Sequence, residues 1–196
     1  MKLCKLLLAT VAATVLLGAL AGAASARNYS STSQTWRSSF REVRFNGVFG
    51  NITCQMTLEG SMHSRTITKE PFILIGYVTT ANLGPCAEGR ATILRETLPW
   101  HERRLRFTRI LPNFGSVTDS IGFNFRIQEP FAGCLASSTA ERPALLTFNR
   151  EVTGVLTTAE VGGTIPTSCG VEGSFTSSRG PVTVLNSSTR ITLGLI

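Results

Sequence analysis

The sequence predicts an all-β domain, an antiparallel β-sandwich in the first instance and a β-barrel as the alternative, with two disulfides. Two observations lead to this expectation: apolar and polar residues alternate over many short segments, and four cysteines follow a segment typical of exported proteins. No window beyond residue 26 sustains a helical apolar stripe over three turns. The nearest helical candidate, Ser137–Arg142, is short and can equally be a loop.

The first 26 residues have the features of a secretory signal peptide. Lys2 and Lys5 precede an apolar stretch that runs from Leu6 to about Leu20, and Ala24-Ser25-Ala26 matches the small-x-small pattern of signal cleavage. An uncleaved membrane anchor is the alternative, but the sequence turns polar directly after Ala26. We therefore expect residues 1–26 to be removed and the remaining chain to be secreted, with no membrane span after cleavage.

Four cysteines remain after this cleavage, and an even number in an exported chain indicates disulfides. Three pairings are possible, and we favour Cys54–Cys86 with Cys134–Cys169 because sequential pairing closes two loops of similar length. A four-cysteine zinc site would need two close C-x-x-C pairs, which the sequence lacks. We expect structural cysteines, no metal and no cofactor.

The chain beyond the signal divides into two parts. Residues 27–39 are polar and aperiodic, so we expect a flexible lead-in in which only Trp36 docks. Residues 40–196 have the length of one domain with its own core.

The strands of this domain are predicted from period-two alternation. In Ile52–Glu59 and in Ile121–Gln128, every second residue is apolar, as in a half-buried strand. Turn residues separate such segments, among them Asn46-Gly47 and Gly162-Gly163. Further strands are expected at Val43–Phe49, Phe72–Thr79, Ala91–Leu98, Leu105–Ile110, Ala144–Phe148, Val152–Thr157, Gly170–Thr176, Val182–Leu185 and Arg190–Leu195.

The charge balance is modestly positive. The formal net charge of the whole chain is +7, and loss of Lys2 and Lys5 with the signal leaves about +5. That balance permits attraction to acidic polymers. Nucleic acid is not expected as a partner, because no row of aromatic residues on one face is evident.

The candidate binding residues are Trp100, His101, Arg104 and Arg106. A Trp-His-Glu cluster after Pro99 can line a pocket, although Trp100 can equally cap the core while His101 and Glu102 face water.

The arginines come from the most cationic part of the chain. If residues 103–109 form a strand, Leu105 and Phe107 point inward, and Arg104 and Arg106 point outward. There they can bind phosphate or carboxylate groups, or simply protect an exposed strand edge.

Catalytic motifs are scarce. The chain has two histidines, His63 and His101, one aspartate and no G-x-S-x-G elbow, and the sequence after His101 fails the H-E-x-x-H pattern. The sequence therefore favours a secreted, non-enzymatic module that binds a cell-surface glycan, an anionic polymer or a protein. The alternatives are a secreted carbohydrate-acting hydrolase with paired glutamates, and a barrel-type carrier of a small ligand.

Three segments between residues 58 and 101 carry a resemblance to known proteins. Leu58–Ile67, Leu74–Val78 and Thr97–His101 are similar to secreted, β-rich proteins of high-GC Gram-positive bacteria that have no assigned activity. The resemblance implies export and a β fold, and it transfers no functional residue.

Overall fold

The computed structural model describes residues 28–47, 50–108, 114–128, 133–170 and 172–196, so the expected signal peptide lies outside the described residues. The all-β prediction is confirmed. The strands are β1 (Asn28–Ser31), β2 (Thr35–Gly47), β3 (Gly50–Met62), β4 (Thr66–Thr68), β5 (Leu74–Ala87), β6 (Arg90–Ile93), β7 (Trp100–Thr108), β8 (Ser116–Ile121), β9 (Asn124–Gln128), β10 (Gly133–Ser137), β11 (Ala144–Arg150), β12 (Leu156–Pro166), β13 (Glu172–Ser177), β14 (Gly180–Thr183) and β15 (Leu193–Leu195). A short 3₁₀ turn, η1 (Arg95–Thr97), precedes β7.

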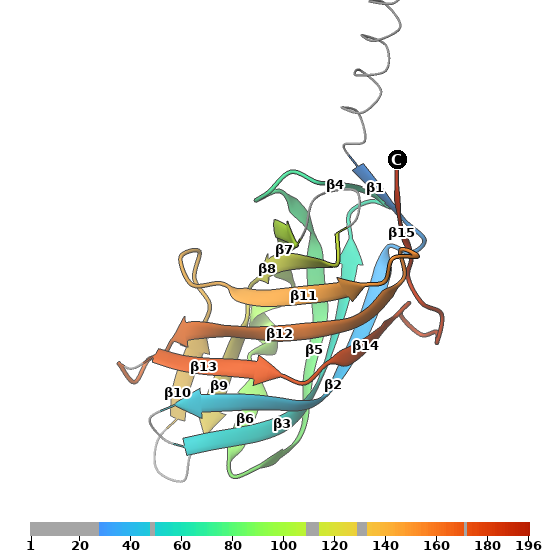
Figure 1. Cartoon of the computed structure of the whole chain (residues 1–196). Coiled ribbons are helices and arrows are strands. Elements are labelled where there is room, and N and C mark those ends of the chain that lie inside the picture. The colour runs from blue at the N-terminus through green and yellow to red at the C-terminus, as the bar shows by residue number, and fades with distance from the viewer. Residues whose placement is uncertain (1–27, 48–49, 109–113, 129–132, 171) are drawn as a thin grey trace, which may run out of the picture.

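The largest sheet closes on itself. Its antiparallel order runs β11-β8-β7-β5-β3-β2-β13-β12, and β12 pairs again with β11, while β14 bridges β12 and β2. Figure 1 shows two facing walls, with β11, β12, β13 and β2 in front of β5, β7 and β8. The fold thus combines the two packed layers of a sandwich with the closure of a barrel, and closure removes exposed strand edges from this sheet.

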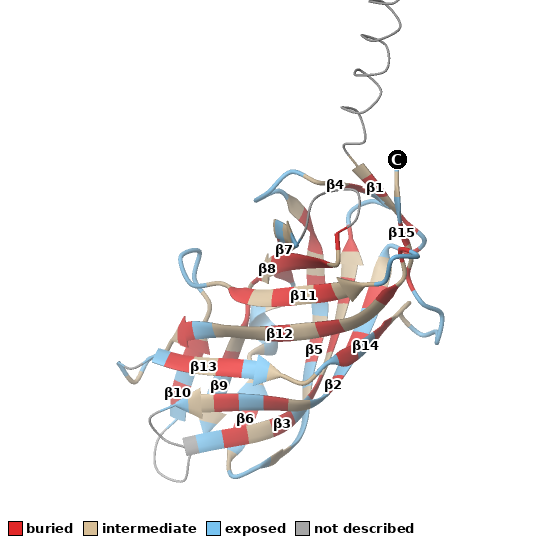
Figure 2. Ribbon diagram, in the orientation of Figure 1, coloured by how far each residue is buried: buried red, intermediate tan, exposed pale blue. Residues whose placement is uncertain are grey.

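Two small sheets cover this large sheet. β10, β9 and β6 form one, and β15, β1 and β4 form the other. The alternation along the strands gives the burial bands of Figure 2. Ile52, Cys54, Met56 and Leu58 are all buried, as their spacing predicts.

Aromatic side chains fill much of the described interior. Phe123 stacks on Phe175 with ring centroids 4.7 Å apart, and Phe125 lies 4.6 Å from Phe45. Trp36 meets Phe148 edge-on at 5.3 Å. These rings occupy space in which a barrel-type carrier would hold its ligand.

Both predicted disulfides are confirmed. Cys54–Cys86 joins directly paired positions of β3 and β5, and Cys134–Cys169 ties β10 to the segment after β12. The second bond therefore fastens a small sheet to the large one. Two disulfides are compatible with an extracellular protein.

The expectation of a flexible lead-in at residues 27–39 is wrong for the part that the structure describes. Residues 28–31 form β1 between β15 and β4, with Tyr29 buried. Residues 35–39 begin β2, and Trp36 is fully buried, as predicted for that side chain. A polar composition did not prevent strand formation here, because the Ser and Thr side chains form hydrogen bonds with the backbone. Ser31 and Ser33 are bonded in this way.

Other local expectations also need correction. Gly162 and Gly163 lie within β12 instead of a turn, because other backbones approach them closely; a Cβ at Gly162 would lie 3.0 Å from the Phe175 carbonyl oxygen. The expected strand at Val152 is a turn that leaves Val152 exposed. Ser137–Arg142 is not helical. Within the described ranges, no helix has the length and apolar character needed to cross a membrane.

Candidate functional site: an open groove beside β7

Strand β7 carries most of the residues that the sequence analysis singled out, and it sends them to opposite faces. Trp100, Glu102 and Arg104 point into the barrel and are buried, whereas His101 and Arg103 are exposed. The outward orientation expected for Arg104 is therefore wrong. The pairing of β7 with β8 shifts register between Arg104 and Arg106, which places a bulge there and breaks the alternation.

The bulge also changes the side chains around it. Leu105, expected to point inward, lines a groove on the outer surface. Phe107 packs against the core, as predicted. Arg106 is exposed, also as predicted, but it does not line the groove.

Inside the barrel, Arg104 belongs to a buried charged cluster. Its Nε lies 3.0 Å from Oδ1 of Asp119 on β8, and the two side chains are 3 % and 1 % exposed. Glu102 lies beside them and accepts a hydrogen bond of 3.3 Å from Trp36 Nε1. The contact between Arg104 and Asp119 is ionic and lacks the alignment of a good hydrogen bond, so several of these polar atoms are incompletely satisfied.

Burial shifts the pKa values of both carboxyls in this cluster. Burial raises the pKa of Glu102 well above its ordinary value, and the charge of Asp119 and a hydrogen bond with Asp119 raise it further. Burial also raises the pKa of Asp119, against the opposing charge of Arg104. Burial therefore favours the protonated form of Glu102, while Asp119 lies against the Arg104 guanidinium. Both carboxyls are enclosed, whereas a hydrolase needs its pair to face a cleft.

The outer face of β7 forms the floor of an open groove of about 580 Å³. His101, Arg103 and Leu105 come from β7, Ser120 from β8, and Phe72 from the segment before β5. Thr139 and Pro143, from the loop before β11, complete the opposite side. Among the described residues that line the groove, none is acidic. The two candidates Trp100 and His101 are thus brought together here, while Arg104 and Arg106 are not.

Phe72 is held at the rim in an unusual conformation. Its φ of 64° lies in the left-handed region, which costs a non-glycine residue about 1 kcal/mol or more. Its backbone N–H donates to the Arg104 carbonyl at 2.6 Å, and this bond fixes the segment to β7. The ring is nevertheless 69 % exposed. A strained backbone that presents a large apolar side chain to solvent is typical of a binding surface.

Gly122, which also lines the groove, lies close to Trp100. A Cβ at Gly122 would lie 3.2 Å from the Trp100 side chain, so the glycine lets the chain pass close over the indole. Phe123, the residue after Gly122, donates a backbone hydrogen bond of 2.7 Å to the Ser138 hydroxyl, which holds the chain in place after Gly122. The sequence analysis missed Phe72, Arg103 and Gly122 because only the pairing of β7 with its neighbours brings them together.

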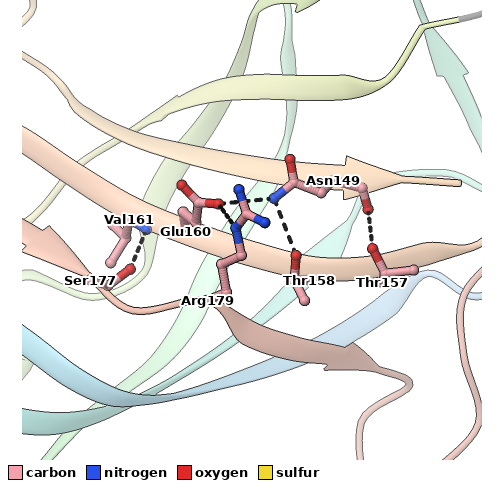
Figure 3. A network of polar contacts seen from close by, with 7 residues as sticks. All are labelled: Asn149, Thr157, Thr158, Glu160, Val161, Ser177 and Arg179. Atoms are coloured by element: carbon pink, nitrogen blue, oxygen red, sulfur yellow. Dashed lines mark hydrogen bonds and ion pairs between the residues drawn. The ribbon is translucent and has the colours of Figure 1, made fainter.

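The opposite wall carries a polar network of a different kind (Figure 3). Glu160 Oε1 accepts hydrogen bonds from Arg179 Nε at 2.6 Å and from Asn149 Nδ2 at 3.2 Å. Asn149 also donates to Thr158, next to the irregularity where β11 and β12 lose register. These groups satisfy one another and fix the β11–β12 pairing, which favours a structural role for this network.

Comparisons with family models, with curated proteins and with solved structures found no match to this chain. The geometry of the groove is therefore the basis for a functional assignment.

Proposed function

We propose that this protein is a non-enzymatic extracellular module that binds an acidic glycan in the groove beside β7. The observation that carries the proposal is the composition of the groove: an exposed Phe72 ring, the Arg103 guanidinium and the His101 imidazole, with no acidic side chain among the described lining residues. This combination suits a sugar ring that carries an anion.

Each part of the groove matches a part of such a ligand. A pyranose ring has an apolar face of C–H groups that packs on an aromatic ring, and the exposed Phe72 offers one at the rim. Its hydroxyls need donors and acceptors, which Ser120, Asn124 and Thr139 supply. A carboxylate or sulfate can form charge-assisted hydrogen bonds with Arg103.

Binding of acidic and neutral oligosaccharides of equal length tests the proposal. We expect the purified, disulfide-bonded protein to bind oligogalacturonate or a heparin fragment and to bind a neutral cello-oligosaccharide more weakly, as measured by isothermal titration calorimetry. Since Arg103 would bond to the anion, Arg103→Ala should raise Kd about tenfold or more. The preference for the acidic ligand should shrink as ionic strength rises.

Arg106→Ala is the matched control, because it removes the same charge from the same strand outside the groove. It should leave Kd nearly unchanged. Equal losses from Arg103→Ala and Arg106→Ala would show attraction by general charge and would overturn the groove as the site. Tight binding of inorganic polyphosphate with no binding of any acidic glycan would overturn the ligand class.

A further inference from the structure

A row of three rings leads away from the groove across the outer face of the sheet. His101 on β7 lies beside Tyr77 on β5, with ring centroids 5.4 Å apart, and Tyr77 lies 5.0 Å from His63 at the end of β3. Tyr77 and His101 are directly paired residues of neighbouring strands, so the row runs across the strands. The two histidines of the chain, 38 positions apart in sequence, thus flank one tyrosine.

The row joins two hollows. His101 lines the groove, and His63 lines a second hollow of about 210 Å³. Ser64, Thr66 and Thr68 contribute hydroxyls to the second hollow, and among its described lining residues none is acidic. Both ends of the row therefore have the same chemistry: hydrogen-bonding groups and apolar surface without a negative charge.

The row is held in place by the backbone. The His63 N–H donates to the Ile75 carbonyl at 2.9 Å, which continues the β3–β5 pairing past the end of β3. The His63 carbonyl accepts a bond from the Gln34 side-chain amide at 3.3 Å. His63 and His101 are exposed and Tyr77 is half-buried, so solvent reaches the row along its length.

From this arrangement we infer that the ligand is a linear polymer that occupies both hollows and crosses the rings of His101, Tyr77 and His63. This inference rests on the proposed function and extends it, because it requires several consecutive sugar units and not a single terminal one. Apolar faces of the middle units would pack on the rings, while the units at each end would bond to hydroxyls and to Arg103.

The dependence of affinity on ligand length tests the inference. Calorimetry with an acidic disaccharide and with a hexasaccharide of the same repeat should give a Kd at least about tenfold lower for the hexasaccharide, beyond the gain from the larger number of equivalent binding positions. Tyr77→Ala and His63→Ala should each abolish this gain and leave the disaccharide affinity unchanged. Tyr77→Phe should retain the gain, because it keeps the ring.

Thr79→Ala is the matched control. Thr79 is an exposed residue of the same strand, two positions after Tyr77, and it lines neither hollow, so its replacement should leave both affinities unchanged. Equal affinity for the two lengths would overturn the polymer track while leaving groove binding intact. Equal weakening of both lengths by His63→Ala would also overturn the track, and Arg103→Ala would then test groove binding separately. Failure to bind either length would overturn the proposed function together with the track. His63→Ala changes an exposed residue and provides the test even if Tyr77→Ala does not fold.

Discussion

The two faces of β7 carry similar residues under opposite conditions. The inner face has Glu102 and Arg104, which are buried against Asp119 and Trp36, and the outer face has His101 and Arg103, which are open to solvent. On the inner face, each charge has already been removed from water and depends on a specific partner. On the outer face, the charge remains hydrated and available. Position relative to the pleat, and not residue type, thus separates the buried structural groups of this strand from the groups that are open to solvent.

The largest effect should come from breaking the inner pair. Arg104→Met would leave the Asp119 carboxylate buried without its cation, and we expect a loss of about 3–5 kcal/mol in the free energy of unfolding. Arg103→Met on the outer face should cost less than about 0.5 kcal/mol. Urea denaturation of both variants measures the contrast.

The double variant Arg104→Met/Asp119→Leu sharpens this test. It removes both charges, so it should recover most of the stability that Arg104→Met loses. If Arg104→Met and Arg103→Met had the same cost, the distinction between the two faces would be wrong.

A smaller effect is expected from the residue that allows Trp36 to reach Glu102. A Cβ at Gly60 would overlap the Trp36 indole, so Gly60→Ala should displace the ring and cost about 1–3 kcal/mol. Thermal unfolding followed by tryptophan fluorescence would report both the loss and the changed surroundings of the indole. Gly194→Ala serves as the control, since its Cβ would meet nothing within 4 Å.

The inner face should also make stability depend on pH. Because the folded-state pKa of Glu102 lies above its value in the unfolded chain, its contribution is fully present below the ordinary carboxyl pKa. The contribution is lost as pH rises toward the raised folded value, by at most about 1.4 kcal/mol per pH unit for one proton.

Glu102→Gln imitates the protonated side chain and removes this dependence. The amide oxygen can still accept the bond from Trp36, and the amide nitrogen can donate to Asp119. Urea unfolding should find the variant close to the wild type at pH 4 and more stable than the wild type at pH 8. A constant difference between the two proteins across that range would contradict the buried proton.

The smallest expected effect concerns the outer face alone. Arg103→Ala and Arg106→Ala should both change the free energy of unfolding by less than about 0.5 kcal/mol, since neither side chain is buried. Any difference between them in glycan binding then reports ligand contact and not altered folding. A large loss of stability from Arg103→Ala would show that the groove arginine is structural.

The sequence predicts much of this fold because its information is local. The alternation in Ile52–Glu59 and the spacing of the cysteines each depend on neighbouring residues, and strand β3 and both disulfides follow them. Asn46-Gly47, expected as a turn, instead ends β2, where both residues pair with β3. The burial of Arg104 could not be predicted in this way. One bulge reverses the side-chain alternation beyond it, and the partner that stabilises Arg104, Asp119, lies on another strand.

The groove was even less accessible to prediction. Its rim residue Phe72 belongs to an expected strand, and its exposure follows from a left-handed backbone conformation that the sequence does not signal. Trp100 and His101 were found because an aromatic and an imidazole side by side after a proline suggest a pocket. Their neighbours in space include Phe72 and residues from segments 120–124 and 138–143, which are distant in sequence and are brought together only by the fold.

The pairing of β1 with β15 has a consequence for the time course of folding. These strands bring residue 32 against residue 192, which are 160 positions apart in sequence. Contacts of such separation are entropically expensive to close and form slowly. Before these contacts form, Tyr29 is not yet buried, and the nearby side chains of Arg104 and Arg150 remain accessible to water.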